Sequence, residues 1–315
     1  MVDQRNSTLL VLLAGILWSF SGVLIKEIHW NALSVAATRA FIGGLIQFFF
    51  LFICLKKAAR GTVNEFQVTP WVVLKDIVAS RSFWQWLGAI SFVANMLALV
   101  FAFQLSPAAN AVTLHYSGMV LVGFLSGPML KQPPKKQDWI ALIIALSGIF
   151  LLGKDGWDTH AYAGTILGLF CGLTLAMDQI CQGIRVQQDS SGFGALKNVI
   201  LANLLMTLIG LPAIVLSCIH GNMPPPHEWI LLLILGIVPW GVPDILYALG
   251  IRHVPVFRAL IIGLFDPLLT SVWPILALAE YPSKLAIFGG VIIIFAIIYQ
   301  AYFEQRRLNT TVSLS

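Results

Sequence analysis

The sequence contains few charged residues and few cysteines for its length. Its 315 residues include only 19 Lys and Arg and 14 Asp and Glu, which make up 10% of the chain, whereas 58% is hydrophobic. A soluble globular protein has about 25% charged residues, so these side chains cannot cover a water-facing surface of this size. The shortage of charge excludes soluble enzymes, secreted disulfide scaffolds and disordered tails, and it indicates a multi-pass membrane protein.

Motifs for metal binding, catalysis and nucleotide hydrolysis are also missing. The four cysteines form no CxxC pair, and Cys218, His220 and His227 lack regular ligand spacing, so we expect no metal and no cofactor. The patterns GxSxG, HExxH, GxGD and the P-loop are absent, and no loop is long enough for a nucleotide-binding domain. The net charge of +5 comes from basic residues in short loops, so no nucleic-acid partner is expected. We therefore predict neither an enzyme nor an ATP-driven pump.

Ten apolar runs follow one another along the chain, each near the length of a spanning helix. A helix needs about 20 mainly apolar residues to cross a bilayer. The first run is longer than the apolar core of a signal peptide, so we expect an uncleaved spanning helix. The longest loop is predicted at 56–82. The runs are 8–28, 32–55, 83–105, 107–130, 137–153, 162–182, 195–219, 228–251, 255–279 and 284–303.

The lysines and arginines are unevenly divided between the two sides of the predicted membrane. Fifteen lie on the side of the amino terminus, three lie on the opposite side, and Arg39 falls inside the second run. Cytoplasmic loops of membrane proteins carry an excess of Lys and Arg. This asymmetry predicts an inner or plasma membrane protein with both termini in the cytoplasm.

The two halves of the chain resemble each other at an offset of 148 residues, without a gap from residue 87 to 134. Each half has five runs, an odd number, so the halves would have opposite orientations in the membrane. Inverted repeats are typical of secondary transporters with a site near the midplane, although a chance alignment of Gly and Pro is the alternative. We predict an all-α membrane protein of ten transmembrane helices in two inverted five-helix repeats, 1–153 and 154–315. The aligned residues include Leu87-Gly88 with Leu235-Gly236, Pro107 with Pro255, Ala111 with Ala259, and Pro134 with Pro282.

The order and spacing of several residues resemble the EamA branch of the drug/metabolite transporter superfamily over nearly the whole chain. The resemblance implies a ten-helix carrier of small metabolites, with export as the commoner direction. Two departures leave the halves chemically unequal, since the first half has Met119 in place of Pro267 and Gln132 in place of Glu280. The residues that carry it are Gly15, Trp18-Ser19, Arg39, Pro107 and Ala111, then Pro255, Ala259, Asp266-Pro267, Glu280 and Gly289-Gly290.

Asp244 is the strongest candidate for a binding residue. Trp240, Asp244 and Tyr247 are spaced i, i+4 and i+7, which places them on one face of a helix near the middle of the bilayer. Two aromatic rings beside a carboxylate suit a cation or an ammonium group. Pro239, Gly241 and Pro243 interrupt this helix, which is tolerated at depth against protein or a wet cavity. The alternative is a buried aspartate that bonds a neighbouring helix.

His115 and Asp266 form a second candidate group. Asp266 aligns with Gly118, and His115 lies one helical turn before that glycine, so both side chains are predicted to line a cavity between the halves. Such a pair, with Tyr116 beside it, could carry protons as a coupling ion. The alternative for His115 is a satisfied core histidine.

Four further residues in apolar runs have structural explanations as well as functional ones. We expect Asp178 to form an ion pair with Arg185 near the cytoplasmic end of its helix. Arg39 is expected to bond backbone carbonyls or Glu27. Asn95 and Trp18 are candidates to line the cavity, although Asn is often interhelical glue and Trp an interface anchor.

Taken together, these residues predict a secondary transporter that moves a small organic solute by alternating access. The carboxylates favour an amino acid, an amine or another cation-bearing solute, and the lipid bilayer is a further expected partner. The rival within transport is a carrier of an anionic or sugar-linked solute that uses Arg39. A flippase for lipid-linked groups and an enzyme of membrane lipids are the rivals from other classes. A flippase would need a groove open to lipid, and an enzyme would need a convergent metal or nucleophile set.

Overall fold

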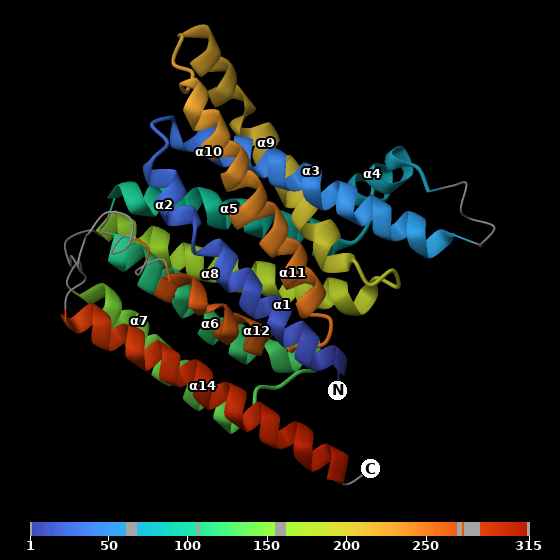
Figure 1. Ribbon diagram of the computed structural model, residues 1–315, viewed down its shortest axis with the longest axis vertical. Helices are drawn as coiled ribbons and strands as arrows, with labels where there is room; N and C mark the ends of the chain where they lie inside the picture. The colour runs from blue at the N-terminus through green and yellow to red at the C-terminus, as the bar shows by residue number, and fades with distance from the viewer. Residues whose placement is uncertain are drawn as a thin grey trace.

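Helices make up all the regular structure in the described part of the chain (Figure 1). The structure is a computed structural model that describes residues 2–60, 68–105, 108–154, 162–269, 273 and 284–313. The helices of the first half are α1 (Val2–Trp18), α2 (Ser21–Lys26), α3 (Ala32–Ala59), α4 (Pro70–Val78), α5 (Phe83–Leu105), α6 (Ala108–Leu130) and α7 (Lys136–Gly153). Those of the second half are α8 (Tyr162–Gln188), α9 (Gly194–Ile219), α10 (Pro226–Gly236), the π-helix η3 (Ile237–Gly241), α11 (Val242–Gly250), α12 (Val256–Gly263) and α14 (Lys284–Ser313).

Several of these helices are long and apolar enough to cross a membrane. Within the described residues there are five, or six if α4 and the start of α5, bent by 86°, form one span. Two shorter apolar helices cover Leu114–Leu130 and Ile287–Phe303. The prediction of an all-α, multi-pass membrane protein is confirmed, whereas the number of ten transmembrane helices stays a prediction. The five spans are Arg5–Ile25, Ala32–Ala59, Tyr162–Gln188, Gly194–Ile219 and Pro226–Gly250.

The outer surface of the spans is apolar, as a bilayer requires. On α3, Phe41, Leu45, Phe49 and Ile53 are 41–62% exposed and recur every four residues. This spacing places them on one side of the helix. The opposite side of α3 is buried and carries small residues and the polar Gln47. A helix that exposes large apolar side chains and buries polar ones is oriented for lipid outside and protein inside.

The stretch predicted as a loop at 56–82 contains a helix, α4. Thr69 caps its start by accepting a hydrogen bond from the backbone N–H of Val72, and Pro70 occupies the first turn, where it is tolerated. Val73 and Ile77 are buried, so α4 packs one apolar side against the protein.

Breaks occur in two helices of the second half. The break that Pro239, Gly241 and Pro243 predict is present, because a π-helix, η3, separates α10 from α11. The ninth apolar run is not one helix, since α12 ends at Gly263 and a further helical turn covers 265–269. Residues 274–283 of this region, together with Pro107, lie outside the described residues.

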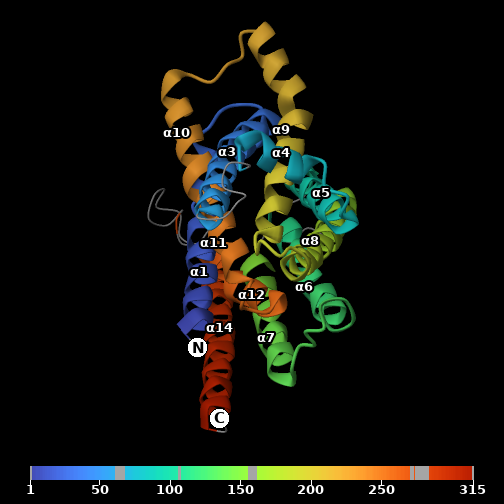
Figure 2. The same cartoon turned by 90° about the vertical axis from the view of Figure 1, so that its right-hand side faces the viewer.

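Contacts between helices repeat when the two halves are exchanged. Helix α3 packs on α9, and α7 packs on α14, as both views show (Figures 1 and 2). Helix α1 packs on α11 and α12, and its counterpart α8 packs on α5 and α6. This pattern agrees with two repeats about a pseudo-twofold axis. The boundary between 153 and 154 stays a prediction.

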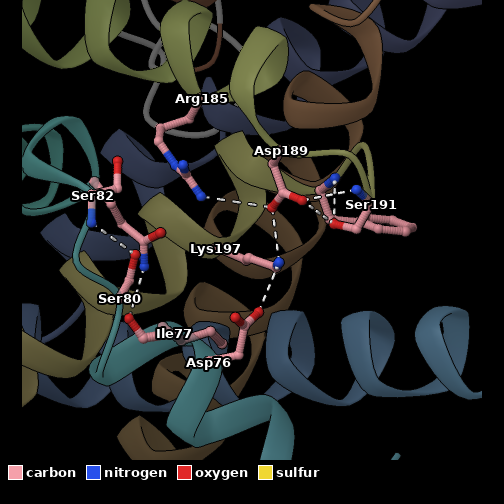
Figure 3. A network of polar contacts seen from close by, with 10 residues as sticks. Asp76, Ile77, Ser80, Ser82, Arg185, Asp189, Ser191 and Lys197 are labelled. Carbon is pink, nitrogen blue, oxygen red and sulfur yellow. Dashed lines mark hydrogen bonds and ion pairs between the residues drawn. The ribbon is translucent and has the colours of Figure 1, made fainter. Parts of the chain in front are cut away.

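A network of ion pairs joins α4, α8 and α9 at the end predicted to be cytoplasmic (Figure 3). Lys197 Nζ lies 2.8 Å from carboxylate oxygens of both Asp76 and Asp189. Arg185 Nη2 lies 3.7 Å from Asp189, which also accepts hydrogen bonds from Ser191. Burial alone would raise the pKa of Asp189, but the bonds from Lys197 and Ser191 outweigh it, and the pKa lies below its ordinary value.

Candidate functional site

Asp244 lies at the meeting point of helices from both halves. Its Oδ1 accepts a hydrogen bond of 3.1 Å from the indole N–H of Trp18 on α1. Its Oδ2 accepts one of 3.1 Å from the side-chain amide of Gln47 on α3. Only 6% of Asp244 is exposed. Both hydrogen-bond donors to this carboxylate are therefore neutral, and no cation of the described chain lies within 4.0 Å of it. Arg39 attracts it electrostatically from a greater distance.

Two amides that the sequence analysis did not select complete this cluster. Gln47 accepts a hydrogen bond of 2.8 Å from Asn203 on α9. Asn203 in turn accepts one of 2.8 Å from the indole N–H of Trp240. A buried amide in an apolar run costs less than a charge, so Gln47 and Asn203 gave a weaker signal than Asp244. A polar residue among the apolar residues of its own helix was the only signal that could have found them.

The π-helix brings Trp240 close to α3. A side chain at Gly43 would place its Cβ 2.6 Å from Trp240 Cδ1, so this approach requires glycine. Trp240 also packs edge-on against Phe92, its counterpart in the repeat, at 5.9 Å between ring centroids. In a π-helix the hydrogen bonds join residues five apart instead of four, and such segments are frequent at functional sites.

Arg39 stacks on the same ring. Its guanidinium carbon lies 4.0 Å from the centroid of the Trp240 ring, and its Nη2 lies 3.8 Å from the sulfur of Met96. No carboxylate of the described residues lies within 4.0 Å of the Arg39 guanidinium, and its buried Nε has no hydrogen-bond partner among those residues. The expected pairing with Glu27 is wrong, because Glu27 is exposed while Arg39 is buried.

Tyr247 connects this cluster to α8. Its ring packs against Trp18 with centroids 5.3 Å apart, and its hydroxyl donates a hydrogen bond to Gln179. The side-chain amide of Gln179 donates to Asp178. The structure thus brings together Trp18, Trp240, Asp244 and Tyr247, four of the predicted residues, and it extends the group to Asp178.

The expected ion pair between Asp178 and Arg185 is wrong. Arg185 pairs with Asp189 instead, and Asp178 accepts hydrogen bonds from Gln179 and Gln182 at 3.2 and 2.9 Å. Seven residues along a helix correspond to about 10 Å, which exceeds the reach of an ion pair, whereas Asp189 lies one turn from Arg185.

The remaining predicted residues form two small groups. Asn95 Nδ2 lies 3.4 Å from His115 Nδ1, and it donates to the backbone oxygen of Cys171 and the hydroxyl of Thr174. Tyr116 donates a hydrogen bond of 3.1 Å to Asp266. Among the described residues no bond joins His115 directly to Asp266. Asn95 fits the role of interhelical glue between α5 and α8, and Tyr116 takes the contact considered for His115.

A cavity of about 240 Å³ lies between α3, α5 and α9. In its wall, Ala36 and Met206 lie one helical turn from Arg39 and Asn203, and Leu97 is next to Met96. Within the described residues, no group of three His, Cys, Asp or Glu could hold a metal ion. The cavity is lined by Asn31, Ala32, Leu33, Ala36, Leu97, Phe101, Met206 and Ala213.

The chain is similar to several proteins named as transporters. An "Uncharacterized transporter" of Archaeoglobus fulgidus is 24% identical over 92% of this chain and 94% of its own. The "Uncharacterized transporter sll1319" of Synechocystis sp. is 22% identical over 92% of this chain and 91% of its own. The "Uncharacterized transporter YwfM" of Bacillus subtilis is 26% identical over 53% of this chain and 55% of its own.

The fold and the family are shown by two further comparisons. A solved crystal structure has a TM-score of 0.72 and 15% identity, and the match covers 94% of this chain and 97% of the other, which shows the likeness of fold alone. The EamA-like transporter family matches residues 6–154 and again residues 164–301. The chain therefore belongs to the EamA-like transporter family of the drug/metabolite transporter superfamily.

Proposed function

We propose that this protein is a secondary transporter of the cell membrane that moves a small cation-bearing solute, such as an amine or an amino acid, by alternating access. One observation carries the proposal. Asp244 is buried between α1, α3 and α11 with hydrogen bonds from Trp18 and Gln47 and no cation within 4.0 Å among the described residues. A solute ammonium group would neutralise this carboxylate, and the rings of Trp18 and Tyr247 would face its charge.

The surrounding helices support binding that depends on conformation. The donors to Asp244 come from α1 and α3, and Asp244 itself belongs to the second half. A relative movement of the halves would therefore change which groups Asp244 contacts. The π-segment before Asp244 provides a point where the helix can change its register with little loss of hydrogen bonding.

The test is a thermal-shift screen of purified protein against amines and α-amino acids, followed by counterflow of a labelled hit in proteoliposomes. A ligand that binds the folded state raises its apparent stability. We expect Asp244→Asn to lose the shift and to reduce counterflow at least tenfold. Asp76→Asn is the matched control, since the side chain of Asp76 is 56% exposed and remote from the cluster. Unchanged transport by Asp244→Asn would overturn the proposal.

An anionic solute is the second candidate, because Arg39 has no carboxylate within 4.0 Å among the described residues and lies one turn from the cavity wall. Dicarboxylates and sugar phosphates in the same screen test it. A shift by these compounds that is lost in Arg39→Gln and retained in Asp244→Asn would favour this candidate over a cation-bearing solute.

A further inference from the structure

Asp178 carries the least satisfied carboxylate among the described residues of the membrane interior. It lies ten residues before the end of α8, about 15 Å along the helix. It is 3% exposed, and both amides that bond it donate to the same oxygen, Oδ2. The other oxygen, Oδ1, is buried without a hydrogen-bond partner among the described residues. An ionised carboxylate in this position is costly unless a cation or proton neutralises it.

A second acceptor without a partner lies beside it. Gln182 is 2% exposed, and its amide nitrogen contacts Asp178 Oδ2, while its Oε1 has no partner in the described part of the chain. Because Gln182 follows Asp178 by one turn of α8, the two free oxygens belong to adjacent head groups. Carboxylate and amide oxygens are the ligands that hard cations prefer.

The charged groups of the surrounding helices do not neutralise Asp178. Among the described residues, α5 offers no titratable side chain, α6 offers His115 and Tyr116, α9 offers Lys197, and α12 offers Arg258. Lys197 forms ion pairs with Asp76 and Asp189. Arg258 forms one with Asp138. Arg185 pairs with Asp189. The charge that acts on Asp178 is that of Asp244, which is also negative. Tyr247 on α11 and Cys181 on α8 interact with Asp178 as weak acids and bring no positive charge.

We propose that Asp178 and Gln182 form a binding site for a monovalent coupling cation, either a proton on Asp178 or an alkali-metal ion between Asp178 Oδ1 and Gln182 Oε1. Both would satisfy the same free oxygens and neutralise the same carboxylate. The site is separate from Asp244, and it replaces the pair of His115 and Asp266 as the coupling element.

Gln179 links this cation site to the solute site. Its nitrogen donates to Asp178, and its oxygen accepts the hydroxyl of Tyr247, which packs on Trp18, the donor to Asp244. Cation binding that turns the amide of Gln179 would therefore shift Tyr247 and Trp18. The two carboxylates also repel each other when both are charged.

The sign of the coupling follows from this repulsion. The first positive charge to bind, at either carboxylate, removes the repulsion between the two. The second positive charge therefore gains less binding free energy. Cation and cationic solute thus weaken each other's binding, and the weakening is reciprocal. The structure therefore favours exchange of the solute against the cation. This step rests on the proposed function, whereas cation binding at Asp178 does not.

The cation site is tested on purified protein without any solute. Thermal unfolding is measured in NaCl, LiCl and KCl at equal ionic strength, and infrared spectra are recorded during acidification. We expect either stabilisation specific to one alkali ion or a protonated-carboxyl band. In Asp178→Asn the band is lost, or the affinity for the ion falls at least tenfold. Gln182→Leu loses an alkali-ion response but retains a proton band, which distinguishes the two cations.

Two variants keep the result interpretable. Asp178→Glu retains a carboxyl group and shifts the midpoint of the response, which serves if Asp178→Asn does not fold. Asp266→Asn keeps the response, whereas its loss there would place the cation at Asp266 and overturn the proposal. Equal responses of wild type and Asp178→Asn to all three salts and to pH would also overturn the proposal. Asp244→Asn should lose the solute shift and retain a cation response of lower affinity, because its repulsion of Asp178 is removed. Failure of the proposed function would therefore be recognised separately.

Discussion

At the scale of single residues, the two aspartates that share Lys197 make a matched pair. Both carboxylates lie 2.8 Å from Lys197 Nζ, but the side chain of Asp189 is 8% exposed and that of Asp76 is 56% exposed (Figure 3). Breaking a buried pair leaves a charge without compensation, whereas exposed pairs contribute little. We expect Asp189→Asn to lower the free energy of unfolding by about 3 kcal/mol and Asp76→Asn by less than about 1 kcal/mol.

The pH dependence of this difference follows from the pKa of Asp189, which lies below its ordinary value in the folded protein. The stability that Asp189 contributes is present above its unfolded pKa of about 3.9 and is lost as the pH falls through the folded value. The difference between wild type and Asp189→Asn in denaturant unfolding should therefore shrink on acidification below about pH 4. A difference that stays constant to pH 2 would contradict this assignment.

The sequence identified Asp244 because a carboxylate in an apolar run is costly wherever it lies. It did not identify Gln47 and Asn203, because an amide in such a run is cheaper and more common. For Asp178 it predicted the wrong partner, since helical spacing shows which residues share a face and not which head groups meet. Partners such as Trp18 depend on packing between distant helices, which a single sequence does not contain.

At the scale of elements, proline and glycine residues predicted where one helix is interrupted. Pro239, Gly241 and Pro243 indicated the interruption that the structure resolves as η3. The break after Gly263 was missed because residues 259–265 around it are apolar without interruption, although Pro267 lies where a helical turn has just restarted. Helix α4 was missed because its apolar side is short, with Val73 and Ile77 as its buried residues.

The crossing of α6 and α8 depends on two glycines. A Cβ at Gly118 would lie within 3 Å of the backbone of Gly172, which cannot move without shifting α8. We expect Gly118→Ala to destabilise the protein by about 1–3 kcal/mol, measured by thermal unfolding in detergent. Gly127→Ala on the same helix is the control, since its Cβ would meet only Pro133 at ordinary contact distance. Equal stability of the two variants would show that α6 and α8 do not cross at Gly118.

At the scale of the whole molecule, the repeat is symmetric in its contacts and asymmetric in its chemistry. Trp240 packs on Phe92, its own counterpart, and Met96, the counterpart of Asp244, contacts Arg39. The offset of 148 residues was readable because Gly and Pro recur at matching positions. The polar cluster was not readable, because its members come from α1, α3, α8, α9, η3 and α11. The second half therefore supplies Asp244 and the first half supplies its two donors, Trp18 and Gln47, so relative motion of the halves changes the site.

The orientation of the molecule gives the last prediction. The start of α1 and the end of α14 lie near the same end of the molecule in both views (Figures 1 and 2), and fifteen of the 19 Lys and Arg are assigned to that side. Because the positive-inside bias sets orientation, this end should be cytoplasmic. In a variant without the native cysteines, a cysteine introduced by Asn309→Cys should resist an impermeant thiol reagent in intact cells, whereas Asn222→Cys, at an exposed turn after α9, should react. Reaction of Asn309→Cys from outside, with protection of Asn222→Cys, would reverse the orientation.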